Sequence, residues 1–276
     1  MTRNARTRVS CLVLAVGLVL GARYPAHGND TFTPELFAFF NGMPKVTPEK
    51  EATLLKELGY AGISQIYDGG AGLTKRIEAY KKHDVKILSV YLNATETPIA
   101  KETVRGLPPG GIIELTVKRI RPRTVDAIRK TVEMAAKLEL RVAIYPHHGF
   151  AVATIPQALE LIEEVNHPNL GLMFNLCHFL KNERVEDLEA TLEKAAPHLF
   201  SVSTAGADTD GKKWGSLIQT LNKGTFPQTR LFSILKRLDF KGPVGLQCYG
   251  VRGNKKDNLK TSIEAWNNML GQLKTP

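Results

Sequence analysis

Residues 141–175 have the sequence RVAIYPHHGFAVATIPQALELIEEVNHPNLGLMFN, which contains one complete strand–helix–strand unit. The apolar run Arg141–Pro146 predicts a buried strand, and Leu170–Asn175 predicts a second one. Between them, Ile155–Val165 has the length and apolar spacing of a helix. Two strands joined by a crossover helix pair in parallel, so this stretch indicates a parallel sheet covered by helices.

The same alternation extends in both directions from this unit and occurs about eight times between Glu35 and Leu273. The predicted strands are Leu36–Asn41, Gly62–Tyr67, Val85–Asn93, Ile112–Val117, Arg141–Pro146, Leu170–Asn175, Leu199–Ala205 and Pro243–Tyr249. The predicted helices are Pro48–Leu58, Leu73–His83, Ile99–Val104, Thr124–Leu138, Ile155–Val165, Val185–Ala195, Thr229–Leu238 and Asn258–Leu273, with a short one near Trp214–Leu221.

This order predicts an α/β fold, a single (β/α)8 TIM barrel over residues 29–276. An open, doubly wound parallel sheet is the structural alternative. Its nucleotide-binding form requires a Gly-x-Gly-x-x-Gly turn after the first strand, and the sequence has none there.

Every predicted strand has polar side chains at or near its carboxyl end. They are Asn41, Tyr67, Tyr91 and Asn93, Glu114 and Lys118, Tyr145 and His147, Asn175, Ser203, and Gln247 and Tyr249. A closed parallel barrel gathers the carboxyl ends of its strands at one mouth, where such barrels carry out their chemistry. The fold therefore predicts where the site lies, and the reaction has to come from the residues.

The composition is that of a globular protein with a large core, since 43% of the 276 residues are hydrophobic. The formal net charge is +10, and four arginines before Asn29 contribute part of it, which leaves +6 for the rest of the chain. This surplus suits anionic partners, but it is spread along the chain. A nucleic-acid-binding tail would concentrate it, so nucleic acid is not an expected partner.

The N-terminus has the layout of a secretory signal peptide over residues 1–28. Arg3, Arg6 and Arg8 precede the apolar run Cys11–Ala22, and small residues occupy the −3 and −1 positions of a cleavage site ending at Gly28. An uncleaved anchor helix is the alternative, although the run is short for spanning a bilayer. We expect export to the periplasm or the medium, with no membrane anchor after cleavage.

Two cysteines, Cys177 and Cys248, remain after that cleavage. They fall on the sixth and eighth predicted strand segments, which are not neighbours in a barrel, so we expect free thiols and not a disulfide.

Three segments of the chain resemble the xylose-isomerase-like barrels, the superfamily of sugar phosphate isomerases, epimerases and family-2 AP endonucleases. They are Arg141–Gly149, Asn169–His178 and Gly242–Tyr249. The first is similar to the family's strand-five segment, which ends in a glutamate ligand. The second is similar to its Asp-x-x-His segment, and the third to its last strand, which ends in another glutamate.

The resemblance implies a divalent metal such as Mn, Zn or Mg, held by Glu, Asp, His and Glu at the ends of strands five to eight. The matching residues in this chain are Tyr145, Asn175, Ser203 and Gln247. Neutral oxygens do not balance a dication as carboxylates do, so we predict no cofactor at this position. A relocated metal among His147, His148 and His178, with Glu114 or Asp208, is the alternative.

The candidate catalytic residues are His178, His147, Lys118 and Glu114, since imidazoles suit proton transfer near neutral pH and Lys118 could stabilise an oxyanion. For Glu114 the structural alternative is an ion pair with Lys118 or Arg141. The candidate substrate-binding residues are Asn41, Tyr91, Asn93, Tyr145, Asn175, Ser203, Gln247 and Tyr249, because amides and hydroxyls both donate and accept hydrogen bonds to sugar hydroxyls.

An anionic group on the substrate is a further expectation, for the loops after strands seven and eight. These loops carry Lys212, Lys213, Arg252, Lys255 and Lys256, and barrels often hold phosphate there. A solvated loop is the alternative interpretation.

The expected partner is thus a sugar or sugar derivative, neutral or anionic. If the protein is an enzyme, the expected reaction is proton transfer next to a carbonyl: isomerisation, epimerisation or elimination from a keto-sugar. A catalytically silent sugar-binding barrel is the alternative, because four neutral ligand positions are also what the loss of catalysis would leave. An abasic-site nuclease would need a cluster of several metal ions that the sequence does not provide.

Overall fold

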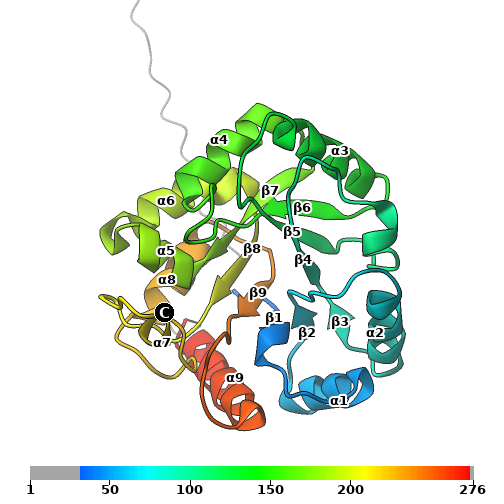
Figure 1. Cartoon of the computed structure of the whole chain (residues 1–276). Helices are drawn as coiled ribbons and strands as arrows, with labels where there is room; N and C mark the ends of the chain where they lie inside the picture. The colour runs from blue at the N-terminus through cyan, green and yellow to red at the C-terminus, as the bar shows by residue number, and fades with distance from the viewer. Residues whose placement is uncertain (1–31, 274–276) are drawn as a thin grey trace, which may run out of the picture.

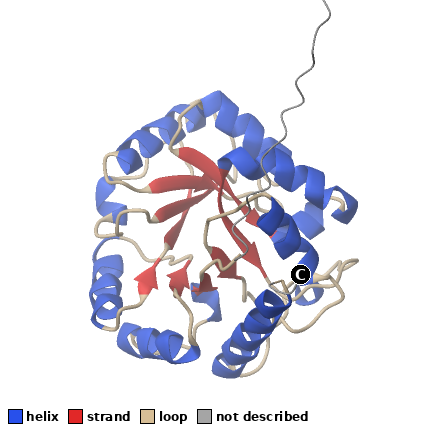
Figure 2. Ribbon diagram, turned by 180° about the vertical axis from the view of Figure 1, so that it is seen from behind, coloured by secondary structure: helices blue, strands red, loops and turns tan. Residues whose placement is uncertain are grey.

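Parallel strands form the centre of the molecule and helices surround them, as Figures 1 and 2 show from opposite sides. A computed structural model describes residues 32–273. The strands are β1 (Leu36–Phe39), β2 (Gly62–Ser64), β3 (Lys86–Ile87), β4 (Ser89–Asn93), β5 (Ile112–Thr116), β6 (Arg141–Ile144), β7 (Leu170–Asn175), β8 (Leu199–Thr204) and β9 (Val244–Leu246). The α-helices are α1 (Pro48–Leu58), α2 (Gly70–Lys82), α3 (Thr124–Ala136), α4 (Ile155–Val165), α5 (Leu176–Asn182), α6 (Leu188–Ala195), α7 (Trp214–Leu217), α8 (Gln228–Arg237) and α9 (Lys255–Gln272).

The sheet closes into a barrel through the pair β3 and β4, which together form the predicted third strand. The hydrogen-bonded order is β3-β2-β1-β9-β8-β7-β6-β5-β4, with every pair parallel. Leu88 separates β3 from β4, yet its N–H donates to Ile63 and its carbonyl accepts from Ile112. A parallel bridge between Ile66 and Val90 completes the ring. The prediction of a TIM barrel is confirmed.

Helix boundaries follow the capping residues. The Thr47 hydroxyl accepts from Lys50 N at the start of α1, and Gly59 ends that helix at φ 85°. Thr154 and Gln157 form a reciprocal capping box at α4, which satisfies N–H groups that have no partner within the helix.

The predicted helix Ile99–Val104 is wrong, and α5 was not expected. The connection after β4 contains only a 3-10 turn, Lys101–Val104, because prolines flank it at both ends and leave too few residues for a stable α-helix. Helix α5 follows β7 without a loop, since the Asn175 side chain accepts from Cys177 N and caps it directly.

The lower interior of the barrel is filled by side chains. Phe39, Ile112, Ala143, Tyr145 and Met173 form an inner cluster, separate from the larger core between sheet and helices. Glycine leaves room for it: a Cβ at Gly245 would lie 2.2 Å from Cε1 of Phe39. This part of the barrel interior is therefore a packed core and not a pore.

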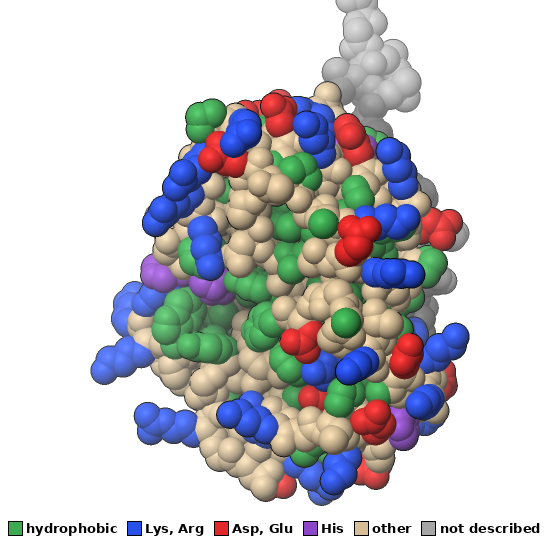
Figure 3. Space-filling model, turned by 45° about the vertical axis from the view of Figure 1, so that its right-hand side comes forward, with side chains coloured by type: hydrophobic (Ala, Val, Ile, Leu, Met, Phe, Trp, Pro, Cys, Tyr) green, Lys and Arg blue, Asp and Glu red, His purple; other side chains and the backbone are tan. Residues whose placement is uncertain are grey.

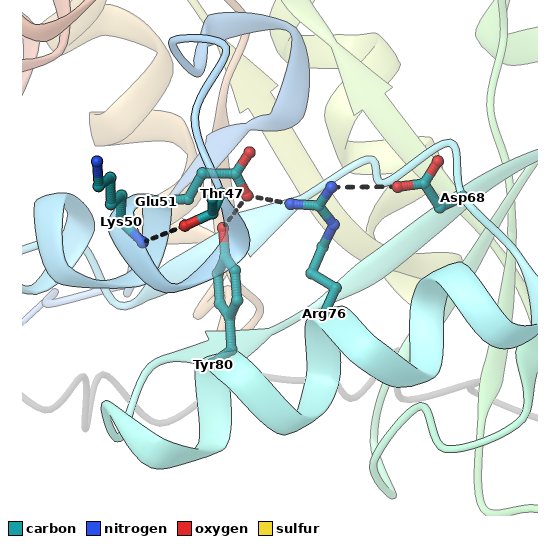
Figure 4. A network of polar contacts seen from close by, with 6 residues as sticks. All are labelled: Thr47, Lys50, Glu51, Asp68, Arg76 and Tyr80. Carbon is teal, nitrogen blue, oxygen red and sulfur yellow. Dashed lines mark hydrogen bonds and ion pairs between the residues drawn. The ribbon is translucent and has the colours of Figure 1, made fainter.

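A polar network joins α1 to α2 on the outside of the barrel (Figure 4). Arg76 forms an ion pair with Glu51, which also accepts from the Tyr80 hydroxyl at 3.1 Å, and Nη2 of Arg76 donates to Asp68 at 3.1 Å. Burial raises the pKa of Glu51, and the Arg76 charge opposes this. The guanidinium also lies 4.6 Å from the centroid of the Phe40 ring, so the network supports the loop after β1.

Residues 32–273 contain no helix that is both long and apolar enough to cross a membrane. The predicted signal peptide, residues 1–28, lies outside the described residues. Cys177 and Cys248 are free thiols, as expected.

Candidate functional site

A cavity of about 360 Å³ opens at the carboxyl ends of the strands, where the barrel fold places a site. It is lined by Asn41, Gln65, Tyr67, Tyr91, Tyr145, His147, His178, Trp214, Ile218, Gln247 and Tyr249. We call it the mouth cavity. Figure 3 shows hydrophobic side chains, a class that includes tyrosine, gathered around a hollow, with histidine at its edge and basic side chains further out.

Most of the predicted site residues meet in this cavity. Those that line it are Asn41, Tyr91, Tyr145, His147, His178, Gln247 and Tyr249. Aromatic edges form much of its wall, because each ring from Tyr67 through Tyr91, Tyr145 and His178 to Trp214 contacts the next with centroids 5.3–5.6 Å apart. We call these five rings the aromatic arc. Rings alternating with amides and hydroxyls suit a ligand with both apolar C–H faces and hydroxyl groups.

The backbone of one loop residue, His148, fixes the two histidines in complementary states. Nδ1 of His147 lies 2.9 Å from the carbonyl oxygen of His148, so it must carry the proton and leave a lone pair on Nε2. Nδ1 of His178 accepts from the backbone N–H of His148 at 3.3 Å, so in the neutral ring the proton is on Nε2. One imidazole therefore offers an acceptor and the other a donor, with ring centroids 4.1 Å apart.

Both histidines favour the neutral form. Burial lowers the pKa of His147, and the neighbouring His148 and Lys118 charges lower it further, against the hydrogen bond to the His148 carbonyl. Burial, followed by the charges of His147 and His148, lowers the pKa of His178 well below its usual value. At neutral pH the pair is thus a neutral base beside a neutral donor.

Glu114 lies beneath the mouth cavity and is fully buried. Its carboxylate accepts from Gln65 Nε2 and from the Ser89 hydroxyl, each at 2.6 Å. Burial raises its pKa to about 7, against those two hydrogen bonds. Neither of the ion pairs considered as the structural alternative for Glu114 forms: Arg141 lies 5.0 Å from the Phe200 ring at the opposite end of the strands, and Lys118 is exposed beyond the end of β5.

Asn175 and Ser203 are buried and do not belong to the lining. Asn175 Nδ2 donates to the Tyr145 hydroxyl at 2.5 Å, while its Oδ1 accepts from Cys177 N. The Ser203 hydroxyl is buried with no partner among residues 32–273. Asn175 acts through its neighbours, because it caps the helix that carries His178 and donates a hydrogen bond to the hydroxyl of Tyr145.

Asn93 and Lys118 border a second cavity outside the mouth. Asn93 accepts from the Thr116 hydroxyl at 2.7 Å, and Lys118 Nζ lies 5.3 Å from the Phe150 centroid. Lys118 is exposed after the end of β5 and does not line the mouth cavity, so this geometry does not support the oxyanion-stabilising role predicted for it there.

The lining residues Gln65, Tyr67, Trp214 and Ile218 were not among the predicted site residues. Gln65 has φ 56°, the left-handed region that L residues with a Cβ rarely adopt, and such conformations cluster at functional sites. The position of Tyr67 at the end of a predicted strand was a signal available in the sequence, whereas the end of β2 before Gln65 was not. Trp214 and Ile218 enter from the long connection after β8, whose path the sequence did not determine.

Of the four positions that match the family's metal ligands, all but Ser203 form side-chain hydrogen bonds within the part of the chain that the structure describes. Gln247 Oε1 accepts from Asn41 Nδ2 at 2.8 Å and from two backbone N–H groups. Burial raises the pKa of Tyr145 well above its usual value, so the phenol stays protonated. These two residues, together with Asn175 and Ser203, offer a metal ion no negatively charged oxygen ligand. Within residues 32–273 no group of three His, Cys, Asp or Glu side chains is arranged to hold a metal ion.

The lysines expected to bind an anion lie after β8 and β9, and they do not form one site. Nζ of Lys255 donates to the carbonyl oxygens of Asn41 at 2.8 Å and Met43 at 2.9 Å, so this ammonium holds the loop after β1. Lys212 and Lys213 are exposed on the connection before α7.

Several known proteins resemble this chain in sequence or in fold. A probable ketose 3-epimerase from Synechocystis sp. is 26% identical over 144 residues, which are 51% of this chain and 46% of the relative. The chain thus matches about half the length of that curated relative. A D-allulose 3-epimerase from Methylomonas sp., solved in complex with D-allulose, superposes with a TM-score of 0.64 and 15% identity, covering 86% of this chain and 98% of that one.

The IolI protein, solved with a bound zinc atom, superposes with a TM-score of 0.65 and 15% identity, covering 87% of this chain and 99% of that one. At these identities the structural matches show a shared fold. A family model for the xylose isomerase-like TIM barrel matches residues 100–269, well over half of the chain. The protein therefore belongs to the xylose isomerase-like TIM barrel family, a group resembling sugar isomerases and epimerases.

Proposed function

We propose that this protein is an exported sugar isomerase or epimerase that transfers a proton next to a carbonyl without the divalent metal usual in its family. The observation that carries the proposal is the pair His147 and His178, whose backbone partners leave a lone pair on one Nε2 and a proton on the other. The family relationship supports a sugar as the ligand.

On this proposal, neutral side chains have replaced the charged metal ligands of the family. The oxygens of Asn175 and Gln247 accept from backbone N–H groups, and the Tyr145 phenol is protonated. Such a set does not fit a dication, which prefers charged or unoccupied oxygen ligands. The oxygen that the metal would polarise then needs a different partner.

The histidine pair supplies both parts of the reaction. Nε2 of His147 accepts the proton from the carbon next to the sugar carbonyl, and Nε2–H of His178 donates a hydrogen bond to the carbonyl oxygen as it gains negative charge. A neutral imidazole is a suitable donor here, because it does not protonate the enediolate outright. For isomerisation, His147 returns the proton to the former carbonyl carbon while the hydroxyl proton of the enediolate passes to the oxygen of that carbon, which makes the other carbon the new carbonyl. For epimerisation, a second acid returns a proton to the opposite face of the carbon that lost it.

Exchange of substrate C–H protons with deuterated solvent tests the proposal. Wild-type protein incubated with a panel of keto- and aldo-sugars, D-allulose included, should incorporate deuterium next to the carbonyl, as followed by NMR. His147→Gln and His178→Gln should each lower the rate about 10²- to 10⁴-fold. His83→Gln, at the end of α2 and away from the mouth, should leave it unchanged.

A catalytically silent sugar-binding barrel is the rival function. The neutral hydrogen-bonding groups at the former ligand positions favour it. Saturable sugar binding by calorimetry, with no deuterium exchange for any sugar in the panel, would establish that function and refute the enzymatic one. Exchange that survives in both histidine variants would remove the pair from the mechanism.

A further inference from the structure

A second cavity, of about 640 Å³, lies beside the mouth at the carboxyl ends of β4 and β5. Its lining consists of Asn93, Ala94, Thr95, Glu96, Thr97, Lys118, Arg119, Arg121, Arg123 and Thr124. Four of these side chains are cationic and one is a carboxylate. We call this the basic cavity. A concave surface with an excess of one charge sign attracts ligands of the opposite sign.

Glu96 does not neutralise the basic cavity. Its carboxylate lies 3.9 Å from Arg121 Nη1 and 3.7 Å from Arg123 Nε, which are ion-pair distances too long for hydrogen bonds. Within residues 32–273, Lys118 and Arg119 have no carboxylate in ion-pair range. The guanidinium donors are therefore available to an oxyanion, which they can bind in bidentate geometry.

The N-terminus of α3 adds to the positive potential. Thr124 begins this 13-residue helix and lines the basic cavity, and the preceding Arg123 makes no side-chain cap. The first-turn acid Asp126 pairs with Arg129 at 2.8 Å. The helix dipole therefore acts in the same direction as the side-chain charges.

The basic cavity is tied to the mouth cavity by the loop that carries His147. Lys118 Nζ lies 5.3 Å from the Phe150 centroid, and the Phe150 and His147 rings stack at 4.2 Å. The ammonium and the imidazole are thus within about 10 Å of each other. The backbone fixes this spacing, because Ala151 N donates to the Lys118 carbonyl and His147 N donates to the Val152 carbonyl.

We propose that the sugar bound in the mouth cavity carries an oxyanion group, a phosphate or a carboxylate, which binds in the basic cavity through Lys118, Arg121 and Arg123. The inference rests on the proposed function for the sugar in the mouth, and it adds the class of substrate: an anionic sugar derivative. It also gives Lys118 a role in substrate binding, at the end of the sugar away from the reacting carbonyl.

The test compares the affinities of neutral and anionic sugars. Calorimetry at constant ionic strength with fructose, fructose 6-phosphate and fructuronate gives the ratio of dissociation constants. Charge-assisted hydrogen bonds to a bound oxyanion should make at least one anionic sugar bind about tenfold or more tightly than fructose. The triple variant Lys118→Gln, Arg121→Gln, Arg123→Gln should bring this ratio close to 1.

A matched control removes three charges elsewhere. Lys75, Lys137 and Lys194 are exposed on α2, at the end of α3 and on α6, and their replacement by Gln should keep the ratio of the wild type. Phosphate and carboxylate are distinguished by which of the two anionic sugars shows the preference. The proposal is overturned if the wild type binds all three sugars equally or binds none. It is also overturned if the control loses the preference as the triple variant does, since the effect would then be long-range.

Failure of the two proposals can be told apart, because this comparison measures binding and not turnover. A preference for an anionic sugar that disappears in the triple variant, without deuterium exchange, would keep the binding inference and reject the enzymatic function.

Discussion

The backbone of His148 decides what the two histidines of the mouth can do. Its carbonyl accepts from His147 and its N–H donates to His178, so one residue sets both tautomers. The sequence predicted that His147 and His178 belong to the site, from their places after two strands. It could not predict the tautomers, because these depend on a turn that brings residue 148 close to residue 178.

The pH dependence of catalysis should reflect the environment of His147. The base must be neutral to accept a proton, and burial lowers its pKa below the usual value near 6.5. Activity should therefore persist below pH 6.5 and fall only as the pH drops through this lowered pKa. The profile of kcat/KM against pH checks this, and an acid limb at or above pH 6.5 would contradict it.

Replacing Glu114 with Gln should stabilise the protein at alkaline pH relative to acid pH. The folded-state pKa of about 7 is raised from 4.5, so the folded protein holds this proton more tightly than the unfolded chain. That stabilising contribution is complete below about pH 4.5 and is lost as the pH rises through about 7. The variant lacks this loss. The difference in free energy of unfolding, variant minus wild type, should therefore increase by up to a few kcal/mol between pH 5 and pH 8.

Urea unfolding of both proteins at pH 5 and pH 8 measures the difference. An equal difference at the two pH values would show that Glu114 does not titrate in this range. Loss of structure at pH 5 as well as pH 8 would show instead that the hydrogen bonds from Gln65 and Ser89 require the carboxylate.

At the level of elements, local sequence determined most boundaries but not the ones that shape the site. Caps such as Thr47 and Thr154 placed α1 and α4, because a cap depends on residues within one turn. The seven-residue α5 has a local cap but is too short to be stable without its packing partners. The interruption at Leu88 depends on neighbours that are distant in sequence. The left-handed conformation of Gln65 is likewise held by the hydrogen bond from its N–H to Ser89.

Gly245 should tolerate no side chain, because β9 packs directly on Phe39. A Cβ there would lie 2.2 Å from Cε1 of that ring, which is fully buried and cannot move freely. Gly245→Ala should lower the free energy of unfolding by about 1–3 kcal/mol through overpacking. Gly271→Ala, on α9 with open space around the added atom, should raise it by up to about 1 kcal/mol. Chemical denaturation compares them, and equal stabilities would disprove the packing argument.

At the scale of the whole molecule, the fold was predictable because eight strand–helix alternations specify few architectures. The chemistry was less predictable. The mouth contains both predicted histidines and two of the predicted amides, Asn41 and Gln247, while Lys118 belongs to a neighbouring cavity that forms only when β4 and β5 meet. The excess positive charge, which looked scattered along the sequence, is partly concentrated there.

Export is a proposal that concerns the whole chain. If residues 1–28 direct secretion, mass spectrometry of the protein recovered from the periplasm or medium should give a mature chain that begins at Asn29. Recovery of the uncleaved chain from the membrane fraction would favour an anchor instead.

The aromatic arc gives the protein a built-in optical probe. Of the two tryptophans in the sequence, Trp266 is buried against Phe232 in the outer core, whereas Trp214 lines the mouth and contacts His178. A ligand that displaces water from the indole of Trp214 should change its emission and leave that of Trp266 constant. Fluorescence titration of unlabelled protein can therefore report occupancy of the mouth, and Trp214→Phe should abolish the signal.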